Sequence, residues 1–232
     1  MAILISVATL FAPVYALGIE KGRRGQPLGL SEAGAALKRL SGLQAGISSM
    51  TARTVQTKTS PLLEGVVRTD GRIWIKRPAF LKWEIDRPER LVIVADAESM
   101  TVYRPKAREA TRRLLANDMS ARYTMEFFSS GMTLSMEELS KRFSVSVYSQ
   151  AASTVVELRP KSRLAGRFLK KAVIAYSPDG IPEWFEVENA NGAITRTELG
   201  SVDVNTEIPQ AAFKLQLPGD VVVRQLGEEE VR

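Results

Sequence analysis

The segment between Phe80 and Arg87 alternates apolar and polar side chains, and an Arg-Pro step stands at each of its ends. This alternation has the period of a β-strand that packs one face against a core. Because proline cannot donate a hydrogen bond to a sheet ladder, Arg77-Pro78 and Arg87-Pro88 mark the ends of the strand. The segment therefore predicts a short strand whose apolar face is formed by Leu81, Trp83 and Ile85.

Period-two patterns continue through most of the chain after Met50, with turn residues between them. The Pro178-Asp-Gly180 and Asn191-Gly192 steps have the chemistry of hairpin turns. Local rules also place a turn at Asp70-Gly71. These patterns predict strands at 91–95, 99–103 and 154–158, and an antiparallel meander of strands at 168–177, 182–189 and 193–200.

The region before Met50 has the three-and-four spacing of an amphipathic helix. Ser31 is placed to cap this helix, and its apolar stripe would consist of Ala33, Leu37, Leu40, Leu43 and Ile47. Two shorter helices are predicted at 122–130 and 134–142, the second with Ser135 and Glu138 as a capping box.

The same internal region is rich in methionine and phenylalanine, including Met125, Phe127 and Phe128. These side chains suit an apolar surface that repacks around ligands of different shape. The alternative is that they fill the core of the domain.

The first 30 residues are typical of an export signal followed by a leader. Residues 3–17 are almost wholly apolar, and this run is too short for a membrane span of roughly 20 residues. Val14 and Ala16 stand at the two positions that a signal peptidase recognises. We therefore expect a signal peptide at 1–16 and a flexible leader at 17–30, with a retained hydrophobic anchor as the alternative.

Neither cysteine nor histidine occurs among the 232 residues. Their absence excludes histidine-dependent triads, thiol nucleophiles, zinc sites built on these residues and disulfides. A bacterial lipoprotein takes its lipid on a cysteine just after its signal, so we expect an exported protein without a lipid anchor. The length and a 44% hydrophobic content fit one domain at 31–226, followed by a short acidic tail at 227–232.

The chain is basic, with a formal net charge of +6. Its densest basic stretch consists of Arg104, Lys106, Arg108, Arg112 and Arg113. A solvated face is the expectation, and attraction to anionic lipid headgroups or to an acidic partner is the alternative. Basic residues are interleaved with acidic ones and no aromatic-glycine motif of RNA-binding proteins occurs, so we expect no nucleic-acid binding.

Two pairs of carboxylates share a strand face, Glu84 with Asp86 and Glu186 with Glu188. Their spacing would suit acid and base roles. A strand with one face toward water places charges at the same spacing, and no nucleophile elbow or phosphate loop is present. We therefore expect no enzyme, no metal and no cofactor.

The order of several segments resembles the periplasmic outer-membrane lipoprotein carrier (LolA) family. The resemblance covers Ala33 to Val223 and rests on 48–50 with Gln56, 71–78, 80–88, 91–96, 100–105, 177–180, 188–192 and 213–219. It implies a mainly β fold, an unclosed antiparallel β-barrel covered by a lid made of the N-terminal helix and the short internal helices. It also places Gly71 within a continuing strand, against the local turn rule.

The resemblance implies specific roles for residues. Arg77 would hydrogen-bond the backbone of the lid helix and so latch the empty cavity; an exposed strand-end arginine is the alternative. The cavity for acyl chains would be lined by Leu81, Trp83, Ile85, Leu37, Leu40, Met125, Phe127 and Phe128. The chain departs from the family at Thr54, where many members carry an aromatic residue, and in the order Phe80-Leu81.

The function implied is that of a monomeric periplasmic carrier of acylated lipoproteins. Its partners would be an inner-membrane lipoprotein-releasing transporter and an outer-membrane acceptor. The acceptor shares this fold but is itself a lipoprotein, so the missing cysteine argues against that assignment. The alternatives are a carrier of another lipid, such as a glycolipid or lipid-linked precursor, a hydrolase using Glu186 and Glu188, and a membrane-surface adaptor.

Overall fold

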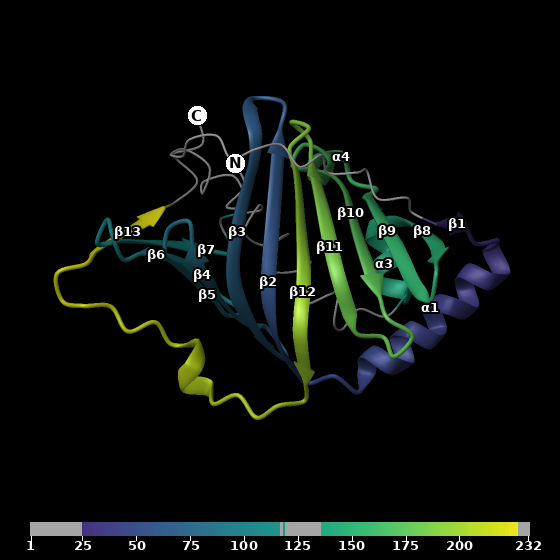
Figure 1. The fold of residues 1–232 in the computed structure, drawn as a ribbon, viewed down its shortest axis with the longest axis horizontal. Coiled ribbons are helices and arrows are strands. Elements are labelled where there is room, and N and C mark those ends of the chain that lie inside the picture. The colour runs from purple at the N-terminus through teal and green to yellow at the C-terminus, as the bar shows by residue number, and fades with distance from the viewer. Residues whose placement is uncertain (1–24, 117, 119–135, 227–232) are drawn as a thin grey trace.

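The computed structural model describes residues 25–116, 118 and 136–226, and these residues form one curved β-sheet with a few helices (Figure 1). The strands are β1 (Gln26–Pro27), β2 (Ser49–Ser60), β3 (Leu63–Lys76), β4 (Phe80–Arg87), β5 (Leu91–Ala95), β6 (Ser99–Arg104), β7 (Glu109–Leu114), β8 (Phe143–Gln150), β9 (Ser153–Pro160), β10 (Leu169–Tyr176), β11 (Pro182–Asn189), β12 (Ile194–Val204) and β13 (Val222–Leu226). The helices are α1 (Leu30–Ala45), α3 (Met136–Arg142), α4 (Arg163–Gly166) and the 3-10 turn η1 (Gln210–Phe213).

Within the described ranges the sheet has 13 strands in the order β1-β8-β9-β10-β11-β12-β2-β3-β4-β5-β6-β7-β13. Its two edge strands, β1 and β13, do not pair with each other, so the barrel is unclosed as predicted. Neighbouring strands are antiparallel except for β13, which pairs with β7 in parallel. The predicted unclosed antiparallel barrel is therefore confirmed, with one parallel pair at this edge.

Gly71 lies inside β3 and not in a turn. It pairs with Thr54 on β2 and with Ile85 on β4. A Cβ at this position would lie 2.2 Å from the carbonyl oxygen of Glu84, so only glycine allows the two backbones to approach this closely. The turn predicted by local rules is wrong, because pairing on both sides holds the chain extended.

The main core covers the inner face of the sheet. Figure 1 shows the long strands β2, β3 and β12 in front, with the strands toward both edges turning behind them. The inward side chains of these strands form one buried apolar cluster. Residues of α1 and Leu139 of α3 pack against that cluster. The two helices therefore lie on the concave side, where the predicted lid belongs.

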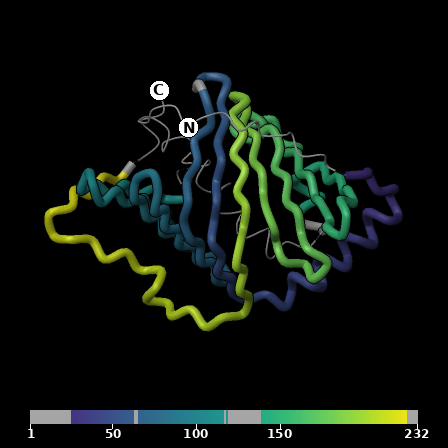
Figure 2. The backbone as a smooth tube through the Cα atoms, in the orientation of Figure 1, coloured from purple at the N-terminus to yellow at the C-terminus, as the bar shows by residue number. Residues whose placement is uncertain are grey.

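The outer face of β3 to β6 is covered by the segment that follows β12. This segment, yellow in Figure 2, leaves β12 and returns past the opposite half of the sheet to reach β13. Its Phe213 ring lies 5.6 Å from that of Phe80, and Lys76 Nζ donates to the carbonyl of Ile208 at 2.7 Å. Strand β5 is buried on both faces for this reason, and all five of its residues are buried.

Helix α1 begins one residue before the predicted cap. Gly29 is the N-cap residue, and its backbone N–H donates to Glu32 Oε2 at 3.1 Å. Ser31 is already inside the helix, so the predicted cap is wrong. Residues 26 and 27 pair with β8, and Leu28 N–H donates to Val147 O at 2.9 Å. The ordered fold therefore begins before residue 30, the end predicted for the flexible leader.

Several predictions concern residues outside the described ranges. These are the signal peptide at 1–16, the helix at 122–130, the capping box at Ser135 and the tail at 227–232. The helix predicted at 134–142 is described from Met136 to Arg142, as α3. Strands β7 and β8 were not predicted, because a basic run and a serine-rich run concealed their alternation.

Candidate functional site

Strand β4 supplies the wall of the inner face. The exposed fractions of Leu81, Trp83 and Ile85 are 2%, 3% and 3%, and all three belong to the main core cluster. The intervening residues Lys82 and Glu84 face outward and form an ion pair of 2.8 Å. The alternation in the sequence thus identified correctly which side of β4 meets the core.

Thr54, where the sequence departs from the family pattern, has a defined partner in that wall. Trp83 Nε1 donates to Thr54 Oγ1 at 3.0 Å, and Thr54 is only 3% exposed. A buried indole N–H needs an acceptor. The threonine therefore supplies a hydroxyl on the inner face that fixes the orientation of the tryptophan ring.

Helix α1 lies beside β8 and α3 and packs its apolar stripe against the core cluster to which this wall belongs. Leu37 is buried within the same cluster as the β4 residues, and Leu40 is partly buried against it. Leu43 lies over the hairpin between β10 and β11, where a Cβ on Gly180 would come within 2.7 Å of Leu43 Cβ. Met125, Phe127 and Phe128 fall outside the described residues, so their place relative to this wall stays a prediction.

Arg77, in the turn between β3 and β4, reaches the C-terminal end of α1. Its Nη2 donates to the carbonyl of Gln44 at 2.6 Å and its Nη1 to that of Ala45 at 3.4 Å. The last carbonyls of a helix lack partners within the helix and carry partial negative charge. Burial lowers the pKa of Arg77, but a guanidinium stays charged at neutral pH. The contact therefore joins a cation to the negative end of α1.

Two more side chains hold the same end of the helix. Asn205, in the left-handed backbone region at φ 58°, donates through Nδ2 to the carbonyl of Gly46 at 2.9 Å and accepts from Ser48 N–H at 2.8 Å. Gln44 Nε2 donates to the carbonyl of Gly180. We call Arg77, Asn205 and Gln44 the latch. Sequence reasoning missed its last two members.

The latch connects α1 to both halves of the sheet. Arg77 belongs to the β3–β4 half, and Gly180 belongs to the β10–β11 half on the other side of β2 and β12. Arg39 Nη2 adds a bond of 3.2 Å to the carbonyl of Pro178 in the same hairpin. The end of α1 is therefore fixed by polar contacts, while its stripe packs against the apolar core.

The sequence profile of the outer membrane lipoprotein carrier protein LolA family matches residues 45–216 of this chain. The chain belongs to the LolA family. The matched region includes Arg77 and the β4 wall, and most of α1 lies before it.

Curated relatives agree with this membership. The chain is 26% identical over 194 residues to the outer-membrane lipoprotein carrier protein of Bordetella avium, an alignment that covers 84% of this chain and 89% of that protein. It is 28% identical over 177 residues to the protein of the same name from Yersinia enterocolitica, covering 76% and 81%. A crystal structure of an uncharacterized conserved protein from Thermus thermophilus superposes with a TM-score of 0.53 at 10% identity, covering 84% and 99%, and shares the fold.

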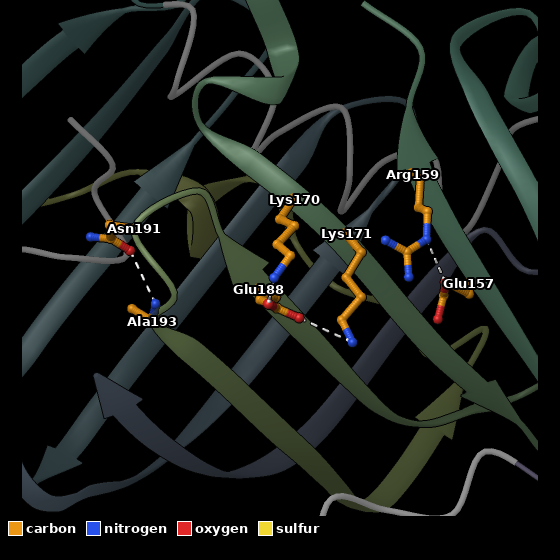
Figure 3. Close-up of polar contacts among 7 residues, drawn as sticks. All are labelled: Glu157, Arg159, Lys170, Lys171, Glu188, Asn191 and Ala193. Atoms are coloured by element: carbon orange, nitrogen blue, oxygen red, sulfur yellow. Dashed lines mark hydrogen bonds and ion pairs between the residues drawn. The ribbon is translucent and has the colours of Figure 1, made fainter. Parts of the chain in front are cut away.

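The glutamates of the two carboxylate pairs in this LolA-family chain lie on the outer face and form ion pairs there. Figure 3 shows Glu188 between Lys170 and Lys171, at 2.6 and 3.0 Å. Burial alone would raise the pKa of Glu188, but the hydrogen bonds from the two lysines outweigh it and leave the pKa lowered. Glu186 pairs with Arg196 at 3.9 Å. These contacts assign both glutamates to ion pairs that join neighbouring strands.

The basic stretch forms the hairpin of β6 and β7 and is partly paired. Arg108 lies 2.5 Å from Asp220, and Arg113 lies 2.8 Å from Asp118. Arg112 donates to Ser99 Oγ at 3.3 Å. Three of the five basic side chains thus contact residues of this chain. No helix in 25–116, 118 and 136–226 is both long and apolar enough to span a membrane.

Proposed function

We propose that this LolA-family chain carries lipoproteins across the periplasm, with their acyl chains held against the inner face of the sheet. The observation that carries the proposal is the position of α1. Its apolar stripe packs beside β8 against the core cluster to which Leu81, Trp83 and Ile85 also belong, and its end is fixed by hydrogen bonds. A cover held in this way can be displaced without unfolding the sheet beneath it.

The energetics favour such a carrier. Each buried methylene contributes about 0.8 kcal/mol, so one long acyl chain in water is disfavoured by on the order of 10 kcal/mol. An apolar surface removes most of this penalty, and binding would then be too tight for delivery. Breaking the latch when cargo enters weakens the net affinity by the free energy of opening. Arg77 therefore sets the balance between uptake and release.

The family supports the partners of this function. A transporter in the inner membrane would load the acylated cargo, and an acceptor at the outer membrane would receive it. A monomer suffices for this transfer, and the proposal includes no catalytic step.

The first test replaces Arg77 with leucine and follows an acylated lipoprotein. Uptake from inner-membrane vesicles should persist, because the wall is intact. Release to the acceptor should fail, because the free energy of breaking the latch no longer weakens the binding of the cargo. Release at the wild-type rate would overturn the latch assignment.

The second test places a charge on the apolar surfaces. Leu81→Glu should abolish binding of a fluorescent fatty acid, because a carboxylate in a wall position opposes contact with hydrocarbon. Leu81 is almost fully buried, so Leu40→Glu on the partly buried stripe of α1 serves as the variant that folds. Leu40→Met, which conserves volume, is the matched control and should bind normally. If Leu40→Glu has the circular dichroism of the wild type and binds the fatty acid unchanged, the lipid does not contact the stripe of α1.

A second candidate is a carrier of another lipid on the same fold. The departure from the family pattern at Thr54 favours it, because a threonine in place of an aromatic residue changes the shape of the inner face that would hold the cargo. Native mass spectrometry of the protein isolated from its own periplasm separates the two candidates, since it shows whether an acylated protein or a free lipid is bound.

A further inference from the structure

The inner face of the sheet changes from apolar to polar along β2 and β12. Near α1, the inward residues of β2 are Met50 and Ala52; farther along they are Thr54, Gln56 and Lys58. On β12 the inward residues opposite them change from Leu199 to Thr197 and Thr195. Lys58 lies nine residues beyond Ser49, or roughly 30 Å at the rise of an extended strand. The polar part is thus far from the latch.

Among the described residues of this part, two buried polar atoms have no hydrogen-bond partner. They are Thr195 Oγ1 and Asn189 Nδ2, and the two residues are 2% and 5% exposed. Their neighbour Thr197 does have one, since Gln56 Nε2 donates to its hydroxyl at 3.1 Å. The large majority of buried side-chain polar atoms are normally paired. Two unpaired atoms on adjacent strands therefore point to a group that binds between them.

The unpaired atoms lie close together on the sheet. Thr195 stands opposite Val187 on one side and opposite Lys58 on the other. Asn189 follows Val187 by two positions and is therefore a diagonal neighbour of Thr195, about 7–8 Å away. An amide N–H₂ donates only, a hydroxyl donates or accepts, and an ammonium donates only. The three side chains, which we call the polar end, are rich in donors.

Lys58 adds a cation to this set. It is 7% exposed, and burial lowers its pKa from the ordinary value. A buried ammonium strengthens hydrogen bonds to oxygen acceptors, because charge-assisted bonds are about twice as strong as neutral ones. The polar end is therefore suited to carbonyl oxygens, whereas an alkyl tail would leave Asn189 Nδ2 and Thr195 Oγ1 without a partner.

We infer that the polar end, Lys58, Asn189 and Thr195, binds the ester carbonyls of a diacylglyceryl group while the hydrocarbon extends toward α1. This inference rests on the proposed carrier function and adds an orientation to it. The glyceryl end of the cargo lies at the far end of β2, and the acyl chains lie on the apolar part of the inner face. The ester groups would satisfy Thr195 Oγ1 and Asn189 Nδ2, the two atoms that are unpaired in the free protein.

The experiment compares two lipids that differ only in those carbonyls. Dioctanoylglycerol carries two esters, and the matched dioctylglycerol ether carries none. Each displaces a fluorescent fatty acid from the full chain, which gives its Kd. The wild type should prefer the ester by about tenfold, the value of one to two hydrogen bonds. Thr195→Val and Asn189→Leu should each reduce that preference about three- to tenfold and leave the ether unchanged.

Stability provides an independent readout. Because the atoms removed have no partner in the free protein, the Tm of Thr195→Val should equal or exceed that of the wild type. Thr57→Val on the outer face of β2 is the matched control and should keep the ester preference.

Two results would overturn the inference, and they differ. If the wild type binds ester and ether equally, or if Thr195→Val keeps the full ester preference, the polar end binds water only and the carrier function stands. If neither lipid displaces the probe, the carrier function falls together with the polar end.

Discussion

Replacing Arg77 with leucine removes both hydrogen bonds that its guanidinium makes to the end of α1. The bond to Gln44 O is short, at 2.6 Å, and has a charged donor, whereas the bond to Ala45 O is 3.4 Å and weak. Hydrogen bonds to charged groups contribute about 1.5–3 kcal/mol. Gln44 O keeps a bond from Ile47 N–H at 3.1 Å, so it is not left unpaired. We therefore expect the low end of the range, about 1.5 kcal/mol.

This free energy has two measurable consequences. The opening equilibrium of α1 should rise about tenfold, because 1.4 kcal/mol corresponds to a factor of ten. If lipid enters only when α1 is open, the apparent Kd equals the intrinsic Kd of the open form divided by the open fraction. A tenfold larger open fraction therefore lowers the apparent Kd tenfold. Arg77→Leu should thus bind a fluorescent fatty acid about tenfold more tightly while its helix becomes less stable.

Hydrogen exchange followed by mass spectrometry measures the first effect on peptides from α1. Peptides from β10 and β11 serve as the internal reference, and Arg72→Leu, an exposed arginine on β3, serves as the matched control. The exchange rate of α1 in Arg77→Lys should lie between those of the wild type and Arg77→Leu. An ammonium keeps the charge of arginine but lacks its planar fork of donors. The reasoning is refuted if α1 exchanges at the wild-type rate in Arg77→Leu, or if exchange accelerates and lipid affinity does not increase.

Further predictions concern the sheet. Thr54→Val should lower the free energy of unfolding by about 1 kcal/mol in urea titrations, because the Trp83 indole loses its acceptor; an unchanged midpoint would contradict this. Gly71→Ala should destabilise by about 1–3 kcal/mol, since the new methyl group would lie 2.2 Å from a carbonyl oxygen of β4, whereas Gly200→Ala has open space and should be tolerated. The pKa of Glu188 is lower in the folded state than its ordinary value of 4.5, so ionised Glu188 stabilises the fold at pH values above 4.5. This stabilisation is lost as the pH falls through the folded-state pKa. Glu188→Gln should therefore flatten the acid side of the Tm–pH profile, and an unaltered profile would exclude the ion pairs as its cause.

The sequence alone was enough to predict which side chains of β4 face inward, because the alternation of faces along a strand is a local property. A strand turns successive side chains to opposite faces, so Leu81, Trp83 and Ile85 share a side wherever the strand lies. The same reasoning located β5 and β11 with their observed bounds and the hairpin turns at Gly180 and Gly192. The stripe of α1 also followed, since Leu37 and Leu40 obey the helical period.

Other features had no local cause. Gly71 reads as a turn residue, and only its simultaneous pairing with β2 and β4 makes it part of a strand. The outer face of β5 is buried by a segment more than a hundred residues later in the chain, so no pattern within β5 indicates that cover. The flexible leader was predicted too long because β1 is held by β8, not by its own composition.

The sequence by itself determined the class of fold, the apolar faces of single elements and the identity of Arg77 as a residue of interest, because strand and helix periods and turn chemistry act over a few neighbours. The tertiary structure alone decided which faces meet. It joined Arg77, Asn205 and Gly180 at one helix end, and it brought Lys58, Asn189 and Thr195 together across three strands. These groupings depend on the register of pairing between distant segments, and register is fixed only when the whole sheet packs its inner face.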